Sequence, residues 1–332
     1  MQKICVISFD NWQYDKFIVQ KLLEKGFEAY HVDLGSFKHA NLWTRIVNLC
    51  SKIFLNKNLK KKKKQEYILE TLSKKGFQDQ VLVINPDVIE LQYHLQIRKF
   101  TAVYTAFLYD SVQRCPIEHL LQNNLFDAVY SFDDADCQQF GFIKSHNFVY
   151  FDKQIPSKKP KYKLVTISSF DKRFSVFNKI AYQLQSKKIP FEFIFVSRNI
   201  TFKTIKYNFK IALGILKEKK INSKLHFRSK KISITSMLKQ YQNAEIILDV
   251  VQGSQTGLSF RVFEAMGMQK KLITDNQAIK KYDFYNQNNI LVIDRKNPVI
   301  TDNFLATTYE PIPSSIYQKY TLDSWVKQVF KI

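Results

Sequence analysis

Gly257, Arg261 and Glu264 are spaced so that they would share one face of an α-helix. They stand in the segment QTGLSFRVFEAMG, which follows the apolar stretch EIILDVV. A glycine that lets backbone approach a ligand, followed by the free N–H groups of a helix start, favours an anion such as a diphosphate. Glu264 would lie about 10 Å further along the helix axis, where a carboxylate can accept ribose hydroxyls. The structural alternative is an Arg–Glu pair on a half-exposed helix.

Carboxylates also follow other apolar runs that are typical of strands. The tripeptide Ser-Phe-Asp ends three of these runs, at residues 8–10, 131–133 and 169–171, and Asp110 with Ser111 follows a fourth. Because ligands of doubly wound sheets bind outside the carboxyl ends of the strands, these side chains stand where substrate chemistry would occur. A common tripeptide can recur by chance, so we interpret the three as positions rather than as a motif.

Strand-like runs alternate with amphipathic helical segments along the whole chain. This alternation predicts an α/β fold of two doubly wound halves, each a parallel sheet with helices on both faces. The Pro- and Lys-rich segment QIPSKKPKYK indicates a linker at 154–163, between domains 1–153 and 164–332. In the second half a long basic helix is expected to reach Lys220, and the last helix, TLDSWVKQVF, could pack back on the first domain.

The chain has 332 residues, 45% of them hydrophobic, and a formal net charge of +22. Such a charge suits an anionic partner, either nucleic acid or a membrane surface. The densest basic cluster, KNLKKKKKQE, follows the apolar and aromatic stretch LWTRIVNLCSKIFL, a combination suited to acidic lipid headgroups. The structural alternative is a solvated helix–loop connection. The expected membrane-contact residues are Lys60, Lys61, Lys62, Lys63 and Lys64.

Cysteine and histidine usage argues against a metal centre. Cys5, Cys50, Cys115 and Cys137 are far apart, so reduced thiols are expected, and the six histidines are scattered. We therefore expect no metal and no other cofactor. The apolar run at the amino terminus is too short for a secretion signal and predicts a buried strand. These observations favour a cytoplasmic protein, peripheral at the inner face of the cytoplasmic membrane if the lysine run contacts lipid.

The segment FRVFEAMGMQKKLIT resembles the nucleotide-sugar-binding helix of GT-B glycosyltransferases, in which a Glu precedes an Ala–small–Gly turn and a hydrophobic strand. The wider chain is similar to bacterial lipopolysaccharide and capsular-polysaccharide glycosyltransferases, near the CgeB-like group. The resemblance implies a GT-B fold, in which two tandem Rossmann-like domains face a cleft. It covers most of the chain from Leu108 onward, in the stretches LYDSV, FDAVYSFDDAD, DVVQGSQTGLSFRVFEAMG, KKLITDN, YDFYNQNNILVIDR and YTLDSWVKQVF.

The resemblance assigns the acceptor to domain 1–153 and the nucleotide sugar to domain 164–332. Glu264 matches the family glutamate that is expected to hold the donor ribose, and Gly257 matches the close-approach glycine. Arg173 falls where GT-B enzymes often have a diphosphate-binding basic residue; an exposed loop cation is the alternative. The donor-binding residues expected on this basis are Ser169, Lys172, Arg173, Gln255, Thr256, Gly257, Arg261 and Glu264.

An inverting transfer needs a base that takes the proton of the acceptor hydroxyl. GT-B enzymes of that type often draw it from the loop after the first strand, where Asp10 lies beside Trp12, an acceptor-side aromatic that could stack on a sugar. Asp110 is the second candidate, and helix capping is the alternative for Asp10. Retaining members carry a further glutamate where this chain has Thr256, so the stereochemical outcome stays open.

The implied function is transfer of a sugar from a nucleotide-sugar donor to a glycan or glycolipid acceptor in cell-surface polysaccharide assembly, without a metal ion. The DDAD segment at 133–136 has the spacing of a metal-binding DxD motif, but the residues after it predict a helix start. Two other classes stay open. One is a basic nucleic-acid-binding α/β protein, although no sequence pattern of a nucleic-acid-binding module supports a nucleic-acid partner. The other is a catalytically inert GT-B-like scaffold.

Overall fold

The computed structural model describes residues 1–10, 12–35, 59–122, 124–154, 157, 159–253 and 255–332. The chain divides into two compact units. The N-terminal unit comprises Met1–His146 together with Leu322–Ile332, and the C-terminal unit comprises Asn147–Thr321. The apolar stretch before the lysine run, Cys50 and part of the expected linker lie outside the described residues.

The N-terminal unit is built on a six-stranded parallel sheet with the strand order β2-β1-β3-β4-β5-β6. Its strands are β1 (Lys3–Ser8), β2 (Glu28–Asp33), β3 (Gln78–Ile84), β4 (Thr101–Leu108), β5 (Ala128–Ser131) and β6 (Ile143–Lys144). Its helices are α1 (Asp15–Glu24), α3 (Leu59–Lys75), α4 (Leu91–Arg98), α5 (Glu118–Leu121), α6 (Asp134–Phe140), α13 (Leu322–Phe330) and the 3-10 helix η1 (Pro86–Val88).

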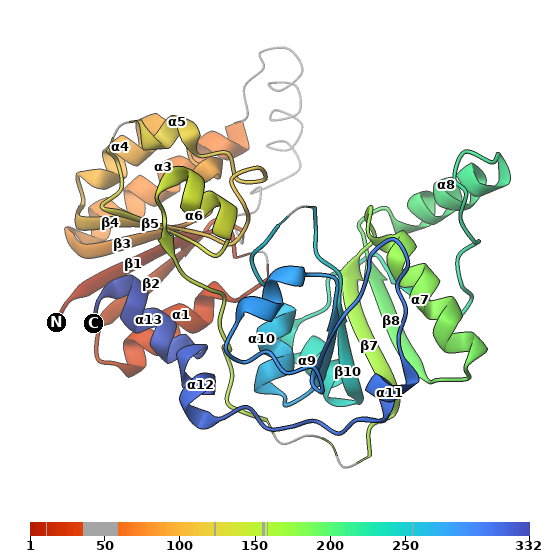
Figure 1. Ribbon diagram of the computed structural model, residues 1–332. Coiled ribbons are helices and arrows are strands. Elements are labelled where there is room, and N and C mark those ends of the chain that lie inside the picture. The colour runs from red at the N-terminus through yellow and green to blue at the C-terminus, as the bar shows by residue number, and fades with distance from the viewer. Residues whose placement is uncertain (11, 36–58, 123, 155–156, 158, 254) are drawn as a thin grey trace. The chain divides into compact units, whose positions relative to one another are not determined.

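Helices cover both faces of this sheet, with α3 and α4 on one face and α1 and α13 on the other (Figure 1). The strands are apolar on both faces for this reason: Ile4, Cys5, Val6 and Ile7 of β1 are all buried. The last helix belongs to this unit because Trp325 of α13 is buried and its ring centroid lies 4.9 Å from that of Phe107 on β4.

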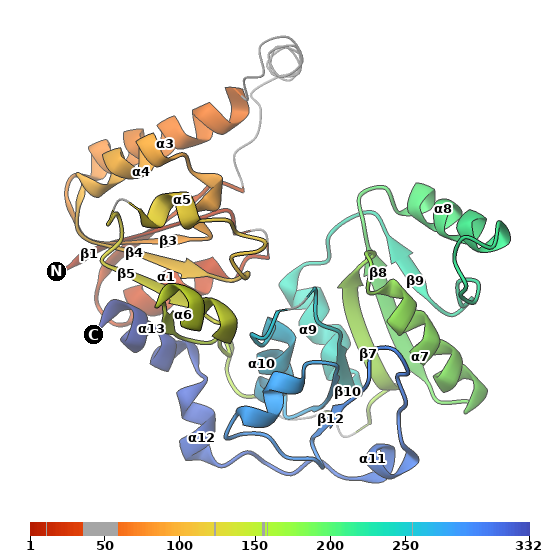
Figure 2. The ribbon, with the colours of Figure 1, turned by 45° about the horizontal axis from the view of Figure 1, so that its top comes forward.

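The C-terminal unit repeats the plan with the strand order β12-β11-β10-β7-β8-β9, again all parallel (Figure 2). Its strands are β7 (Tyr162–Ser169), β8 (Phe191–Val196), β9 (His226–Arg228), β10 (Ala244–Asp249), β11 (Lys271–Thr274) and β12 (Ile290–Val292). Its helices are α7 (Phe174–Ser186), α8 (Ile200–Ala212), α9 (Ile234–Gln242), α10 (Phe260–Gly267), α11 (Asp302–Ala306), α12 (Ser314–Lys319) and the 3-10 helix η2 (Gln277–Lys281). The predicted fold class of two tandem Rossmann-like α/β domains is confirmed.

Each sheet has one point at which the chain reverses the side on which it adds strands. In the N-terminal sheet this point lies between β1 and β3, and in the C-terminal sheet it lies between β7 and β10. Ligands of open α/β sheets bind at such switch points, outside the carboxyl ends of the strands. Asp10 follows β1, Ser169 ends β7 and Gly257 lies in the loop after β10, so the sequence-predicted residues lie beside the two switch points.

The expected long basic helix is wrong in its length. Helix α8 ends at Ala212 instead of Lys220, because Gly214 adopts φ +69°, a left-handed conformation that ends helices. The helix start predicted after the DDAD segment is found within that segment: α6 begins at Asp134, and Asp133 caps it by accepting N–H bonds from Ala135 and Asp136. Among the described residues, none of the helices combines the length and apolar composition that crossing a bilayer requires.

Candidate functional site

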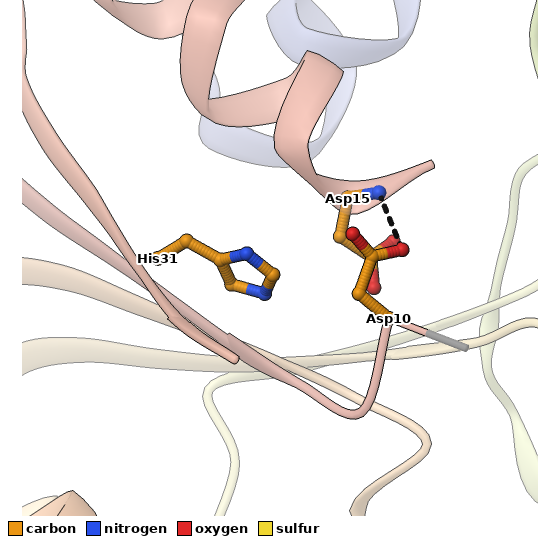
Figure 3. Close-up of side chains that lie close together, drawn as sticks. All are labelled: Asp10, Asp15 and His31. Carbon is orange, nitrogen blue, oxygen red and sulfur yellow. Dashed lines mark hydrogen bonds between the residues drawn. The ribbon is translucent and has the colours of Figure 1, made fainter. Parts of the chain in front are cut away.

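Asp10 is held in an unusual backbone conformation directly after β1. Its φ is +29°, a left-handed value that aspartate tolerates better than most residues. Two hydrogen bonds hold Asp10 in this conformation. Ser8 Oγ accepts the Asp10 N–H at 3.2 Å. Asp10 Oδ1 accepts the Asp15 N–H at 3.2 Å, the bond that Figure 3 shows. Tyr14 is the N-cap of α1, so Asp10 is not the N-cap residue of the alternative interpretation, but its carboxylate still caps the helix start by accepting the N–H of Asp15, the first helical residue.

Asp15 and His31 bring a second carboxylate and an imidazole to the same place (Figure 3). Asp15 is 2% exposed, and its Oδ1 atom has no hydrogen-bond partner among the described residues. His31 Nε2 lies 2.8 Å from Ser8 Oγ, the hydroxyl that also accepts the Asp10 N–H. The three functional side chains thus come from the start of α1, from β2 and from the loop between β1 and α1.

Burial dominates the electrostatics of this cluster. Burial first, and then the neighbouring Asp10 charge, raise the pKa of Asp15 to about 7. Burial also raises the pKa of Asp10, although the Asp15 N–H bond and His31 oppose the shift. The pKa of His31 is lowered because burial disfavours the imidazolium. Near neutral pH the cluster therefore holds a neutral imidazole and two carboxyl groups that compete for ionisation.

Among the described residues, Asp10, Asp15 and His31 form the one group whose ligand atoms lie close enough to hold a metal ion, within 4.8 Å of one another. Two carboxylates and one imidazole would suit a divalent transition metal. The same three groups can equally hold and move a proton, since two carboxyl groups with raised pKa values can share one proton and then carry a single negative charge.

The other candidates of the N-terminal unit lie in different surroundings. Asp110, after β4, is half-buried and forms a 2.5 Å ion pair with Arg114, so its carboxylate already has a cation beside it. Trp12 is 50% exposed, which leaves much of its ring accessible. The structure therefore brings Asp10 together with Asp15 and His31, which the sequence did not single out.

Arg173 lies at the switch point of the C-terminal unit and is buried instead of being an exposed loop cation. Its guanidinium forks onto Asp171, with Nη2 2.7 Å from Oδ2 and Nε 2.9 Å from Oδ1. Its Nη1 donates to the Val250 carbonyl at 2.9 Å, which ties the end of β10 to the end of β7. Burial opposes ionisation of Asp171, but Arg173 outweighs it, and the pKa of Asp171 is lowered.

Arg261 pairs with Asp249 and not with Glu264, so the structural alternative of an Arg–Glu pair on a half-exposed helix is wrong. Its Nη1 lies 2.6 Å from Oδ1 of Asp249, which is 1% exposed, and its Nε donates to the Ile167 carbonyl of β7 at 3.2 Å. Ser259, at the N-cap of α10, donates to Asp249 Oδ2 at 2.8 Å. These bonds fix the beginning of α10 against the ends of β7 and β10.

Glu264 is completely buried, and Tyr150 donates its hydroxyl to Glu264 Oε1 at 2.8 Å. The segment that carries Tyr150 packs tightly on α10. A Cβ atom at Gly267 would lie 2.7 Å from Val149 and 2.8 Å from Phe151, closer than side-chain atoms can approach. The glycine of the EAMG segment is therefore required by packing within this unit, which composition alone could not reveal.

Side chains that follow β11 and β12 bind the backbone of the loop between β10 and α10. Asp275 Oδ1 accepts the Val251 N–H at 2.7 Å, and Arg295 pairs with Asp275 at 2.5 Å while donating to the Val251 carbonyl. Asn276 Nδ2 donates to the Gly257 carbonyl at 3.1 Å. These bonds fix the described loop residues Val251 and Gly257 against the segments that follow β11 and β12.

The remaining donor-site candidates surround this loop. Ser169 is half-buried at the end of β7, and Lys172 is exposed just before α7. Gln255 and Thr256 are half-buried and Gly257 is buried, and all three precede α10. The structure brings Ser169, Arg173, Arg261 and the loop residues to one edge of the C-terminal sheet. Glu264 lies in the middle of α10, on its buried side.

The lysine run lies on α3 and does not form a uniform exposed surface. Lys64 is buried, donates to the Leu34 carbonyl and has its Nζ 4.3 Å from the centre of the Phe9 ring. Lys61 pairs with Glu90 at 3.2 Å. Lys62 and Lys63 are the exposed members, so only part of the expected membrane-contact set faces solvent.

The sequence analysis did not identify several residues that hold the candidate site residues in place. These residues are Asp15, His31, Tyr150, Asp249, Asp275 and Arg295. Asp249, Asp275 and Arg295 end or follow strand-like runs, the signal that did identify Asp10. No comparable signal marks Tyr150, which contacts Glu264 across 114 residues of sequence.

Comparisons with known proteins agree with this fold. No protein-family model matches the sequence, and no curated protein matches it. Among solved structures, the chain is similar to a UDP-forming α,α-trehalose-phosphate synthase from Burkholderia xenovorans in complex with glucose-6-phosphate. The TM-score is 0.62 and the identity 10%, over 100% of this chain and 99% of that chain.

A UDP-GlcNAc 2-epimerase from Methanocaldococcus jannaschii, in complex with UDP-GlcNAc and UDP, gives a TM-score of 0.52 at 13% identity, with 100% of both chains covered. A glycosylation-associated protein (Gap123) complex from Streptococcus agalactiae gives 0.44 at 14% identity, and the chain spans 57% of that protein's length. The first two structures are only 10% and 13% identical to this chain, so the similarity shows the fold alone. That fold is a glycosyltransferase-like GT-B fold.

Proposed function

We propose that the protein is a glycosyltransferase that moves a sugar from a nucleotide-sugar donor to a glycan or glycolipid acceptor. The process would be cell-surface polysaccharide assembly, as in lipopolysaccharide or capsule. The observation that carries this proposal is the switch point of the C-terminal unit, where the fixed loop after β10 leads into the start of α10. The start of α10, with the buried Arg173 and the half-buried Arg261 nearby, suits a diphosphate.

The donor would bind along this edge, with Gln255, Thr256 and Gly257 presenting backbone to the diphosphate. Lys172 supplies an exposed cation before α7, and Ser169 a hydroxyl at the end of β7. We keep Glu264 as the proposed ribose-binding group. Because Tyr150 occupies its Oε1 and the residue is fully buried, ribose binding requires the Tyr150 hydroxyl to leave that oxygen.

We propose Asp10 as the base of an inverting transfer, with Asp110 as the second candidate and Trp12 as the acceptor-side aromatic. The acceptor oxygen bonds to the anomeric carbon while the bond from that carbon to the diphosphate breaks, and the diphosphate leaves with the electron pair. The hydroxyl proton passes to the Asp10 carboxylate. The raised pKa of Asp10 makes it a stronger base than an exposed aspartate.

We propose that the transfer requires no metal ion. The charge of the leaving diphosphate would be balanced by the start of α10 and by Arg173 and Arg261. At the acceptor side, a proton held by Asp15 reduces the negative charge beside Asp10, since its pKa is about 7. Activity that survives exhaustive chelation would support this, and activity restored only by a divalent ion would contradict it.

A glycolipid acceptor would bring the protein to the inner face of the cytoplasmic membrane. The sequence predicts lipid contact through Lys60 to Lys64 on α3, but only Lys62 and Lys63 are exposed and Lys62 is paired with Glu66, so we do not assign the lipid contact to this run. No nucleic-acid partner is part of this proposal.

The test is a thermal-shift screen against UDP, GDP, CMP and their sugars, because a ligand that binds only the folded state raises the melting temperature. Glu264→Gln should lower the affinity for the bound nucleotide sugar by about 10-fold or more, the loss expected for a hydrogen bond to a charged group. The matched control is Glu245→Gln on β10, whose carboxylate pairs with Lys163. If no nucleotide or nucleotide sugar raises the melting temperature, the proposed function is wrong.

A further inference from the structure

Helix α8 exposes an apolar stripe on the side that faces away from its unit. Phe202, Ile205 and Phe209 follow the i, i+3, i+7 spacing of one helical face and are 66%, 62% and 61% exposed. Leu213 and Ile215 continue the exposed apolar surface into the turn after the helix. We call the face formed by these five residues the outer face of α8.

The opposite side of α8 accounts for the packing of the helix on the C-terminal unit. Ile200 is buried, and the Tyr207 ring centroid lies 5.0 Å from that of Phe174 and 6.1 Å from that of Phe170. The helix is therefore apolar on two sides, and the unit covers one of them. In both views α8 projects from the C-terminal unit beyond α7 and β8 (Figures 1 and 2).

Exposed apolar side chains elsewhere in the described residues do not form such a stripe. Large exposed hydrophobics such as Leu23, Phe77 and Leu95 stand singly on different elements, which is normal for a protein surface. A contiguous apolar stripe is not, because soluble proteins rarely leave such patches without a partner.

The charge of the segment identifies that partner. Residues 199–220 contain one acidic residue, Glu218, and Tyr207 donates its hydroxyl to that carboxylate. None of the ion pairs among the described residues includes Lys206, Lys210 or Lys217. The lysines of the segment are Lys203, Lys206, Lys210, Lys217, Lys219 and Lys220.

We propose that the outer face of α8 docks on the surface of a bilayer that contains anionic lipid. Phe202, Ile205 and Phe209 would enter the boundary between headgroups and acyl chains, while the flanking lysines contact the headgroup phosphates. A second copy of the chain is a poorer occupant, because it would bring two rows of unpaired lysines together.

The proposal also distinguishes α8 from the lysine run on α3. On α3, Lys61 is paired with Glu90, Lys62 with Glu66, and Lys64 is buried. None of the exposed large hydrophobics forms a stripe beside Lys62 and Lys63 among the described residues. The two surfaces therefore make opposite predictions for the same assay.

The experiment is cosedimentation of the full chain with vesicles of phosphatidylcholine that contain about 30% phosphatidylglycerol, against pure phosphatidylcholine vesicles. The variant Phe202→Ser/Ile205→Ser/Phe209→Ser should lower partition by about tenfold or more. Lys206→Gln/Lys210→Gln should lower it by about fivefold for each lysine. The matched controls are Phe77→Ser and Lys62→Gln/Lys63→Gln, which should bind as the wild type does.

All substituted residues are exposed, so the variants should fold, and their melting curves would verify this. Equal cosedimentation of wild type and the triple serine variant would overturn the proposal. Sedimentation velocity adds a second criterion: a wild-type dimer that the triple variant dissociates, without vesicle binding, would assign the face to a second copy instead. The assay needs neither donor nor acceptor, so its result is independent of the proposed glycosyl transfer.

Discussion

The carboxylates nearest the two switch points have different kinds of partner. In the C-terminal unit, three carboxylates at strand ends each face an arginine, in the pairs Asp171–Arg173, Asp249–Arg261 and Asp275–Arg295. In the N-terminal unit, Asp10 and Asp15 face each other and His31, and no described lysine or arginine forms an ion pair with either. The chain has 51 basic and 29 acidic residues, so a shortage of cations does not explain the difference.

The difference indicates separate tasks for the two edges. A buried carboxylate paired with an arginine stays ionised and fixes the backbone that it contacts. A buried carboxylate without a cation has a raised pKa, so it can accept a proton near neutral pH. We therefore expect substitutions in the N-terminal cluster to change turnover and pH dependence, and those in the C-terminal pairs to change the free energy of unfolding.

The largest expected effect is on turnover. Asp10→Asn keeps the capping oxygen that accepts the Asp15 N–H but removes the proton acceptor, so the rate should fall by about 10²–10⁴-fold. The melting temperature and donor affinity should stay unchanged. Initial rates with the nucleotide sugar identified by thermal shift would measure the effect. A fully active Asp10→Asn protein would leave Asp10 as a cap only and direct the same test to Asp110.

The next largest effect is on stability in the C-terminal unit. Asp249→Asn would leave the Arg261 guanidinium buried without its carboxylate, so the free energy of unfolding should fall by about 3–5 kcal/mol. Urea denaturation at neutral pH would measure it. The control is Asp302→Asn, whose exposed pair with Lys187 should contribute about 0–1 kcal/mol. Equal losses in the two variants would contradict the structural role assigned to the paired carboxylates.

Asp15→Asn should instead remove a dependence of stability on pH. The folded-state pKa of Asp15 is about 7, above its unfolded value of about 3.9, so the folded state binds the extra proton between these values. Its stabilising contribution is complete below pH 4 and is lost as the pH rises through 7, a change of about 2–4 kcal/mol.

Relative to wild type, the Asn variant should therefore gain stability between pH 4 and pH 8 by that amount. Urea denaturation at the two pH values would measure it, with the exposed Asp79→Asn as control. A constant difference between variant and wild type at both pH values would show that folding does not raise the pKa of Asp15, and would sink the distinction between the two edges.

The sequence predicts the fold better than it predicts the side-chain contacts at the two sheet edges. Alternating apolar runs predict the strands well, because a parallel strand must be apolar on both faces; KICVIS coincides with β1. The strand-end rule also found Asp10. Partners from distant segments were not predictable, since nothing local to His31 or Tyr150 shows that they contact Ser8 and Glu264.

The Ser-Phe-Asp tripeptides show the same limit. In two of them the serine Oγ accepts the aspartate N–H, and in all three the aspartate accepts an N–H at or near the start of the next helix. Local sequence therefore specifies a shared helix-start structure. The tripeptide itself does not specify the partner of its aspartate. Asp171 pairs with Arg173, two residues later in the same loop, whereas Asp10 lies beside Asp15 at the start of α1 and His31 of the neighbouring strand β2.

The smallest expected effect concerns packing instead of charge at the C-terminal edge. Gly267→Ala would place a methyl group 2.7 Å from Val149 Cγ1 and 2.8 Å from Phe151 Cε2, so the free energy of unfolding should fall by about 1–3 kcal/mol. Urea denaturation would again measure it. Val149→Ala removes one of the two clashing groups, so in the double variant Gly267→Ala should cost less than it does alone. Strictly additive effects of the two substitutions would mean that α10 is held at this edge by the Asp249–Arg261 pair and not by its contact with the segment around Tyr150.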